Sequence, residues 1–405
     1  MQQDYITLAL GLPEFRVLGG HEDEHRLTIY LEKKVALGVC PQCGRVSDSV
    51  HDRRVSDIQD IPLRGKGVIL HLIKRRYLCQ NSQCERHRKR LPFVEKYESI
   101  GKNQRRIKRL DQHIYRLAKE MSFTDVAKLL TEQHTPISDC TVGRIYHALA
   151  EEELAERGDP LLWAIGLDEF SIRKRHNYAT VITDLVAHRL VDTFKKRDKK
   201  TVKERLSRLP HKGLIKWAVI DMSPSFAWAV WEALPGVRVV IDKFHVIQQV
   251  IKALDEVRKR IQRSKPKGHK RPIYNLRYKL RKGKEKLSPK EKAELAQFLE
   301  NEPELKLAYE LKESFRDWYE LPGPHRAREG LHQWYSKVER SYLSEFTEVV
   351  ETFKRWEPEI LNYFHWRLTN GYSEGLNNKI KVIKRQGYGY RNFANFRRRI
   401  LVEAA

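Results

Sequence analysis

Three apolar runs in the middle of the chain, each short enough to be a buried strand, reach an aspartate near their end. They are "LLWAIGLDEF", "IKWAVIDMS" and "VRVVIDKF", and the aspartates are Asp168, Asp221 and Asp242. A single aspartate at the end of a strand is usually a turn former or a helix cap. The carboxyl ends of parallel strands, however, lie along one edge of a sheet, where ligands bind. A fold with these strands in parallel would therefore bring the carboxylates together.

The segments around these runs predict a mixed α/β sheet. Three β-rich runs with tight connections, of which the second and third are "NYATVITDL" and "HRLVDTF", predict an antiparallel meander. The two later strands alternate with helices over "KTVKERLSRL" and "PSFAWAVWEAL". The order β-β-β-α-β-α-β is that of the RNase H-like fold. We therefore expect a multidomain α/β protein built around an RNase H-like mixed sheet.

Four of the five cysteines form two tight pairs in the N-terminal part of the chain. Cys40 and Cys43 lie in "CPQC", and Cys79 and Cys84 lie in "CQNSQC". Four thiolates suit one tetrahedral Zn²⁺, and such a closed site is structural because it leaves no position for a substrate. His87 could replace one cysteine, or the four thiols could simply pack without metal. We predict a zinc-ribbon-like module with structural Zn²⁺.

A helical region follows the cysteine pairs. In "RRIKRLDQHIYRLAKEM" apolar residues recur at spacings of three and four, which indicates one buried helix face. The next segment, "SFTDVAKLLTEQHTPISDCTVGRIYHAL", predicts two helices around a turn, the second capped by Ser138 or Asp139. This is the size of a helix-turn-helix, which would present Thr141 and Arg144 to a DNA groove. The alternative is a helical hairpin that only packs.

A large positive charge indicates a polyanionic partner. The chain has 78 Lys and Arg against 53 Asp and Glu, a net charge of +25, and nucleic acid is the simplest partner for such an excess. The most basic stretch begins an all-helical insertion that we expect over residues 251–368. Its charges are either a solvated face or a surface for DNA. The sequence has no run of ~20 apolar residues and no signal peptide, which predicts a cytoplasmic protein without membrane contact.

The C-terminal segment combines an acidic residue with a basic helix. In "YSEGLNNKIKVIKRQGYGYRNFANFRRRILV", Glu374 lies on or just before a helix. Asn377 or Asn378, then Lys381 and Lys384, follow at spacings that keep them near its face. We expect these two lysines and Arg385 to contact DNA. The aromatic residues that follow could stack on unpaired bases, or they could pack the last helix.

Carboxylates that meet at a sheet edge suit a hard divalent cation. Asp168 and Asp221 end strands that can be neighbours, and Glu374 can close the cluster from the side. Mg²⁺ or Mn²⁺ prefers such oxygen ligands, and two ions ~4 Å apart can activate an attacking oxygen and stabilise a leaving one at phosphorus. Asp242 could instead be the second ligand, and His245 could contact a phosphate or support the local fold.

With these residues in view, the sequence resembles the DDE transposases of bacterial insertion sequences, and more closely those of the ISL-three family. The resemblance covers nearly the whole chain and is most specific in "VIDMSPSFAWAV", "VVIDKFHV" and "YSEGLNNKIKVIKRQGYGYRNFANFRRRIL". It implies an RNase H-like catalytic domain that cleaves DNA with Mg²⁺ and joins the freed 3′-hydroxyl to target DNA. It also implies a catalytic triad of Asp168, Asp221 and Glu374, with Asp242 and His245 as a supporting D-x-x-H element.

The resemblance further implies double-stranded DNA as the partner, both as terminal inverted repeats and as target. Joining two DNA ends implies a homodimer or a larger assembly on DNA, in the bacterial cytoplasm at the nucleoid. A catalytically silent DNA-binding regulator derived from such an enzyme is the alternative. The parts that we expect are a zinc-binding module (1–98), a helix-turn-helix domain (99–158), the first part of the catalytic core (159–250), the helical insertion (251–368) and a C-terminal helix region that completes the core (369–405).

Overall fold

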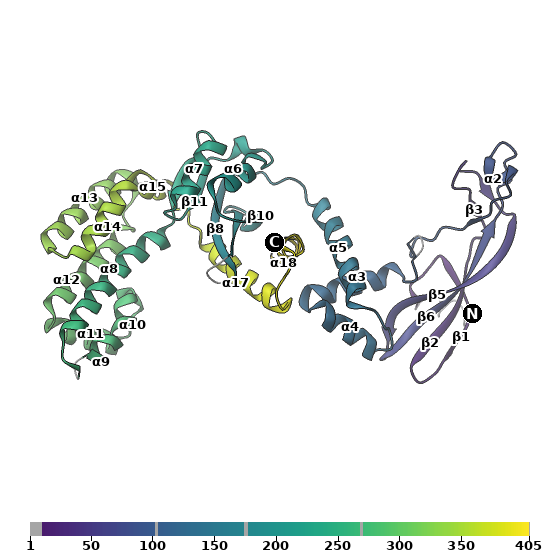
Figure 1. Ribbon diagram of the computed structural model, residues 1–405, viewed down its shortest axis with the longest axis horizontal. Helices are drawn as coiled ribbons and strands as arrows, with labels where there is room; N and C mark the ends of the chain where they lie inside the picture. Colours follow the sequence, from purple (N-terminus) through teal and green to yellow (C-terminus); the bar gives the residue numbers. More distant parts are fainter. Residues whose placement is uncertain (1–9, 102–103, 174–176, 268–269, 405) are drawn as a thin grey trace. The chain divides into compact units, whose positions relative to one another are not determined.

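The computed structural model describes residues 10–101, 104–173, 177–267 and 270–404. The chain divides into two compact units. The first consists of Met1–Arg157 with Val382–Glu403, and the second of Gly158–Lys381 with Ala404–Ala405. Each unit has a hydrophobic core of its own, and Figure 1 shows the elements that build it.

Two small sheets form the N-terminal part of the first unit. Their strands, with one short helix, are β1 (Phe15–Glu22), β2 (Arg26–Lys33), β3 (Gly38–Val39), β4 (Val46–Ser47), β5 (Val50–Leu63), β6 (Lys66–Tyr77), α2 (Glu85–Arg88) and β7 (Phe93–Val94). The larger sheet has the order β1-β2-β6-β5, with β7 also paired to β6, and only β2 and β6 are parallel in it. β3 and β4 pair on either side of the first cysteine pair. The hairpin of β5 and β6 then leads the chain to the second pair.

Three helices complete the contiguous part of the first unit, namely α3 (Lys108–Glu120), α4 (Phe123–Glu132) and α5 (Asp139–Glu156). Ser122 caps α4 by accepting a hydrogen bond from the backbone N–H of Asp125 at 3.1 Å. Ser138 caps α5 in the same way with Thr141 at 3.3 Å. These caps satisfy backbone donors that a helix start leaves open. The predicted pair of helices around a turn is therefore present, and Ser138 rather than its neighbour is the cap.

The C-terminal helix α18 (Phe393–Glu403) packs on these helices. The side chain of Arg399 is nearly fully buried, and its Nη2 donates to the carbonyl oxygens of Ala118 and Met121 at 2.7 and 2.9 Å. These carbonyls lie at the C-terminal end of α3, where a cation is favourable. The end of the chain thus returns to the first unit, and residues 369–405 are shared between the two units.

The second unit contains a five-stranded mixed sheet, from which the helices α8 (Lys243–Ser264) to α14 (Ser344–Arg355) extend to one side (Figure 1). Its elements in chain order are β8 (Ala164–Arg173), β9 (Asn177–Asp184), β10 (Arg189–Lys195), α6 (Lys199–Ser207), η1 (Lys212–Leu214), β11 (Trp217–Ile220), α7 (Pro224–Ala233) and β12 (Arg238–Ile241). The strand order is β10-β9-β8-β11-β12, with the first three strands antiparallel and β11 parallel to both of its neighbours. The element order agrees with the prediction. β11 and β12 are buried on both faces, which is why they read as unbroken apolar runs.

Helices make up the rest of the second unit. They are α8 (Lys243–Ser264), α9 (Lys270–Asn275), α10 (Arg277–Arg281), η3 (Lys284–Lys286), α11 (Pro289–Glu300), α12 (Pro303–Trp318), α13 (Gly323–Ser341), α14 (Ser344–Arg355), α15 (Glu357–Leu361) and α16 (Tyr363–Trp366). Aromatic rings fill the space between them, and the centroid of the Phe315 ring lies 4.7 Å from that of Trp334 and 5.3 Å from that of Phe353. The next helix, α17 (Gly371–Gln386), carries the chain from the second unit into the first. No described helix is long and apolar enough to cross a membrane.

Candidate active site, zinc cluster and DNA-binding surfaces

The three aspartates lie side by side on adjacent strands. β11 pairs in register with β8 through Val219 and with β12 through Ile220. Continued to the next residues, this register places Asp168, Asp221 and Asp242 in one row. Neighbours in register project to the same face of a sheet. The topology thus gathers the carboxylates at one edge of the parallel strands.

The apolar run predicts that β8 ends close to Asp168, but the strand does not end there. The strand continues to Arg173, and Asp168 itself pairs with Val181 of β9. Only the pairing of β8 with β11 stops before Asp168. The expected strand end is therefore wrong here, because an antiparallel neighbour carries the strand beyond the buried edge. Asp221 and Asp242 do follow the last residues of their strands.

His245, in the first turn of α8, lies between two of the carboxylates. Its Nδ1 is 2.8 Å from Oδ1 of Asp221 and 3.5 Å from Oδ2 of Asp242. The contacts are ion pairs rather than well-aligned hydrogen bonds. Burial alone would lower the pKa of His245, but the two carboxylates raise it to about 10. The imidazole is therefore a cation at neutral pH, and it offsets part of the negative charge at this edge.

The surroundings of Asp168 shift its pKa strongly. Burial and the neighbouring charge of Asp221 raise the pKa of Asp168 to about 7. Two donors hold the carboxylate in place. The backbone N–H of Glu169 donates to Oδ1 at 2.7 Å, and Nδ2 of Asn377 donates to Oδ2 at 2.8 Å. Burial and the neighbouring carboxylate thus both disfavour the charged form of Asp168.

A cavity of about 450 Å³ opens beside the aspartates. Glu374, in the first turn of α17, lines it together with Asp168, Asp242 and Lys381. The side chain of Glu374 is exposed and forms no ion pair with a residue that the structure describes. The predicted third acid thus shares a cavity with Asp168 and Asp242, whereas Asp221 does not line it. Among the described residues, no group of three acidic side chains lies close enough together to hold a metal ion as the structure stands.

The loop before α17 is fastened to the sheet by Asn370, a residue that sequence reasoning missed. Its backbone N–H donates to Oδ1 of Asp242 at 2.8 Å, and its Nδ2 donates to the carbonyl oxygen of Leu167 at 3.0 Å. Ser373 in turn donates to Oδ1 of Asn370 at 2.5 Å. The loop packs so closely that a Cβ on Gly166 would lie 2.3 Å from Oδ1 of Asn370. Glycine in β8 is therefore required for this approach.

The four paired cysteines come together in the first unit. Their Sγ atoms all lie within 4.8 Å of one another, with 4.0 Å between Cys40 and Cys84 and 3.6 Å between Cys43 and Cys79. Zn–S bonds of about 2.3 Å in a tetrahedron place the sulfurs about 3.8 Å apart. The donor set therefore fits Zn²⁺ without rearrangement.

Two neighbouring contacts agree with a four-thiolate site. A hydrogen bond from the backbone of Arg45 lowers the pKa of Cys43 to about 6, which favours the thiolate that binds metal. The ring of His87 is engaged elsewhere, since its Nδ1 lies 2.6 Å from the carbonyl oxygen of Cys79. His87 is not a member of the cluster, so the alternative in which it replaces a cysteine is wrong.

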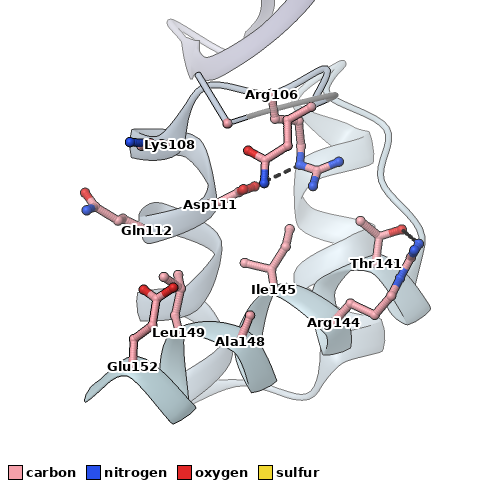
Figure 2. Close-up of a pocket in the computed structure, with 12 residues that line it drawn as sticks. Arg106, Lys108, Asp111, Gln112, Thr141, Arg144, Ile145, Ala148, Leu149 and Glu152 are labelled. Atoms are coloured by element: carbon pink, nitrogen blue, oxygen red, sulfur yellow. Dashed lines mark hydrogen bonds and ion pairs between the residues drawn. The ribbon is translucent and has the colours of Figure 1, made fainter. Parts of the chain in front are cut away.

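The predicted base-contacting residues lie at the start of α5. Arg144 is exposed, and its Nη2 donates to Oγ1 of Thr141 at 2.9 Å. Figure 2 shows both side chains at a cavity of about 520 Å³ between α3 and α5. Lys108 lines the same cavity, as does Arg106, whose Nε donates to Asp111 at 2.8 Å. Where the prediction places DNA, the surface thus carries Arg144 and Lys108 without a carboxylate partner among the described residues, together with the acidic Asp111 and Glu152.

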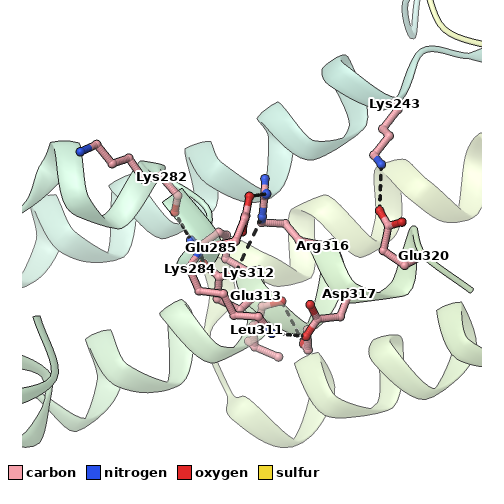
Figure 3. A network of polar contacts seen from close by, with 11 residues as sticks. Lys243, Lys282, Lys284, Glu285, Leu311, Lys312, Glu313, Arg316, Asp317 and Glu320 are labelled. Atoms are coloured by element: carbon pink, nitrogen blue, oxygen red, sulfur yellow. Dashed lines mark hydrogen bonds and ion pairs between the residues drawn. The ribbon is translucent and has the colours of Figure 1, made fainter. Parts of the chain in front are cut away.

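The basic run of the helical region has acidic partners within the same region. Ion pairs join Arg260 to Glu304 at 2.7 Å, Lys265 to Glu302 at 2.6 Å, Lys282 to Glu291 at 2.8 Å and Lys284 to Asp317 at 2.6 Å. Figure 3 shows the contacts around Lys312, which is fully buried, and includes the pair of Lys284 with Asp317. Its Nζ donates to the carbonyl oxygen of Lys282 at 2.8 Å and pairs with Glu313, while burial lowers its pKa. These ion pairs join helices to one another. The sequence predicts only a solvated face or a DNA surface for these charges, and not this role.

Some aromatic side chains of the C-terminal segment are buried and others are exposed. Phe396 is buried, and its ring stacks on that of Tyr390 at 4.6 Å between centroids. The packing interpretation therefore holds for Phe396. Tyr388 is 87% exposed at the end of α17. Of the predicted DNA contacts on α17, two are exposed and one is partly buried, namely Lys381, Arg385 and Lys384.

Two family models match the chain. A model of ISL3-type DDE transposases, described as "Transposase", matches residues 165–400. A second model, described as "zinc-finger of transposase IS204/IS1001/IS1096/IS1165", matches residues 36–84 and so includes all four cysteines. The matches cover the mixed sheet, the helical region and the zinc cluster.

Known transposases are similar to the chain over much of its length. The "Transposase for insertion sequence element IS1001" of Bordetella parapertussis is 27% identical over 379 residues, which is 92% of this chain and 90% of the relative. The "Transposase for insertion sequence element IS1557" of Mycobacterium tuberculosis is 30% identical over 259 residues, 56% of this chain and 57% of the relative. Fold and comparisons together define a transposase with a zinc ribbon. The chain belongs to the ISL-three (ISL3) family of transposases.

Proposed function

We propose that the chain is a DNA transposase that binds the terminal inverted repeats of an insertion sequence. It cleaves DNA strands with Mg²⁺ and joins the 3′-hydroxyl to target DNA by a DDE two-metal mechanism. One observation carries this proposal. Asp168 and Asp221 follow one register on adjacent parallel strands, and Asp168 lines a cavity that Glu374 lines from α17. The strand order of the sheet supports assigning it to the RNase H-like fold.

Asp221 is the better second ligand than Asp242. β11 is the direct neighbour of β8, whereas β12 is one strand further away. The side chain of Asp242 is only 5% exposed, against 24% for Asp221, and one of its oxygens is engaged by Asn370. We assign Asp242 and His245 supporting roles. Asp242 fastens the loop before α17, and His245 offsets carboxylate charge beside the DNA phosphates.

The acidic edge suits a divalent cation. Carboxylate oxygens are the ligands that Mg²⁺ and Mn²⁺ prefer. Burial and the charge of Asp221 raise the pKa of Asp168, and a bound cation would favour its ionised form. Asp168 and Asp221 would hold the ions from the sheet, and Glu374 would reach them from α17. When bound, such ions activate the attacking oxygen and stabilise the leaving one. The side chains themselves supply orientation, and the cavity positions the phosphodiester.

The proposed DNA contacts follow from the positions of Lys and Arg side chains. Arg144 and Thr141 would contact bases of the inverted repeat through the helix-turn-helix, and the zinc module would assist on the same DNA. Lys381, Lys384 and Arg385 would contact phosphates near the cleaved strand. Joining two ends requires at least two active sites, so we propose a dimer or a larger assembly on DNA. The setting of this reaction is the bacterial cytoplasm at the nucleoid.

A cleavage assay tests the proposal. DNA that carries the flanking inverted repeat is incubated with Mg²⁺ or EDTA, with the wild type and with Glu374→Gln side by side. We expect metal-dependent nicking at the repeat end that the variant loses, and joined product from precut ends. Specific binding without cutting in Mg²⁺ or Mn²⁺ would overturn the proposal in favour of a catalytically silent DNA-binding regulator.

A further inference from the structure

Asn377 is a buried polar residue that the proposed chemistry does not yet use. It lies on α17, one turn after Glu374, and it is 9% exposed. Its Nδ2 donates to Oδ2 of Asp168 at 2.8 Å, across 209 residues of chain. Its Oδ1 is buried and has no hydrogen-bond partner among the residues that the structure describes. Buried polar atoms without a partner are rare enough that each requires an explanation.

The orientation of this amide follows from its neighbour. The amide directs its nitrogen toward Asp168 and its oxygen elsewhere, which is the orientation that suits a carboxylate holding a cation, because an ionised carboxylate only accepts hydrogen bonds. Asn377 also lines the cavity that Asp168 and Glu374 share. The unpartnered oxygen is thus a neutral donor atom beside the proposed cation site, and amide oxygens are among the hard ligands that divalent cations accept.

We propose that Asn377 is a positioning residue of the cation site, which holds Asp168 through Nδ2 and directs Oδ1 toward the divalent cation. This inference rests on the proposed function and deepens it. A neutral oxygen is suited to this place because the strand register already puts the carboxylates of Asp168 and Asp221 next to each other. A further carboxylate would add repulsion, whereas an amide adds a donor atom without charge. The hydrogen bond of Asn377 to Asp168 therefore connects α17 to the sheet directly at a proposed metal ligand.

Binding of Mn²⁺ to the full-length protein tests this role without relying on activity. The Asn377→Leu variant keeps the size of the side chain and removes both polar atoms, and Asn377→Ala is the second variant. We expect Mn²⁺ affinity, measured by titration calorimetry, to fall about 10- to 100-fold, as it does when residues that orient metal ligands are removed. The Mg²⁺ concentration for half-maximal cleavage should rise by a similar factor. Affinity for the inverted repeat should stay unchanged.

The neighbouring residue Asn378 provides a matched control. It lies on the same helix and lines the same cavity, but it is exposed and accepts a hydrogen bond from Lys381 at 3.2 Å. Asn378→Ala should leave Mn²⁺ affinity as in the wild type. Tryptophan fluorescence shows whether each variant is folded, because all eight tryptophans lie between residues 163 and 366, in the second unit.

The outcomes separate this inference from the proposed function. If Asp168→Ala lowers Mn²⁺ affinity but folded Asn377→Leu binds Mn²⁺ like the wild type, Asn377 only packs and the inference is wrong. If Asp168→Ala leaves Mn²⁺ binding unchanged, the acidic edge is not the cation site, and the proposed function fails together with this inference. Weakened binding in Asp168→Ala and Asn377→Leu, but not in Asn378→Ala, supports both.

Discussion

The carboxylate of Asp242 accepts a hydrogen bond at 2.8 Å from the backbone N–H of Asn370, 128 residues further along the chain. The bond ties the end of β12 to the loop from which α17 begins. Glu374 lies four residues after Asn370, so the same bond sets where this acid enters the cavity. Asp242 therefore has a structural task that its neighbour Asp221 does not share, and the two aspartates are expected to respond differently to substitution.

Substitution of Asp242 should lower the stability of the second unit. Asp242→Ala leaves the buried N–H of Asn370 without an acceptor, which costs about 1–3 kcal/mol, whereas Asp242→Asn retains an oxygen that can accept the bond. Urea unfolding followed by tryptophan fluorescence measures the second unit specifically. Asp221→Ala is the matched comparison, and it should abolish cleavage with a smaller loss of stability. Equal stability of Asp242→Ala and wild type would contradict the anchoring role.

Removal of a zinc ligand should unfold the cysteine-rich module. Cys40→Ser or Cys84→Ser breaks a four-thiolate set whose metal affinity is also folding free energy. We expect loss of bound zinc by elemental analysis and rapid proteolysis around residues 36–84. Tryptophan fluorescence should be unchanged, because it reports the other unit. His87→Ala is the control and should keep its zinc, since His87 contacts a backbone carbonyl and lies outside the cluster.

Local patterns in the sequence were sufficient for the order of strands and helices around the mixed sheet and for the two cysteine pairs. The unbroken apolar runs of β11 and β12 reflect burial on both faces, and the order of the elements leaves few ways to arrange the sheet. The position of Asp221 directly after a strand could be predicted, because the end of an apolar run is visible in the local sequence. Cys40 and Cys79 could be found because each belongs to a short-range pair.

Contacts between distant segments could not be predicted in this way. The bonds of Asn370 to Leu167 and of Asn377 to Asp168 join residues 203 and 209 positions apart. No local pattern marks Asn370, and the helical spacing that places Asn377 or Asn378 near the face of Glu374 does not indicate a bond to Asp168. The extension of β8 beyond Asp168 depends on pairing with β9 rather than on its own side chains. Likewise, a basic run looks like a DNA surface until the acidic residues that face it are known.

DNA affinity should depend on the exposed cations and not on those that are paired within the fold. Arg144→Ala and the double variant Lys384→Ala/Arg385→Ala should weaken binding to the inverted repeat and flatten its dependence on salt, because fewer counterions are released. Lys284→Ala is the control, since Lys284 pairs with Asp317 at 2.6 Å. Fluorescence anisotropy at several salt concentrations gives both quantities. A loss of affinity in the control as large as in Arg144→Ala would show that the helical region also binds DNA.

The charge on His245 should stabilise the metal-free protein in a pH-dependent manner. The fold raises its pKa from 6.5 to about 10, so its contribution is fully present below pH 6.5 and is lost as the pH rises through about 10. In EDTA, His245→Gln should therefore lower the free energy of unfolding most at pH 6, and the difference from wild type should shrink toward pH 10. Urea titrations by tryptophan fluorescence measure this difference. In an Asp221→Asn background the effect of His245→Gln should be smaller, because one of the two carboxylates that hold the proton is gone. A difference that does not change with pH would mean that His245 acts through packing and not through its charge.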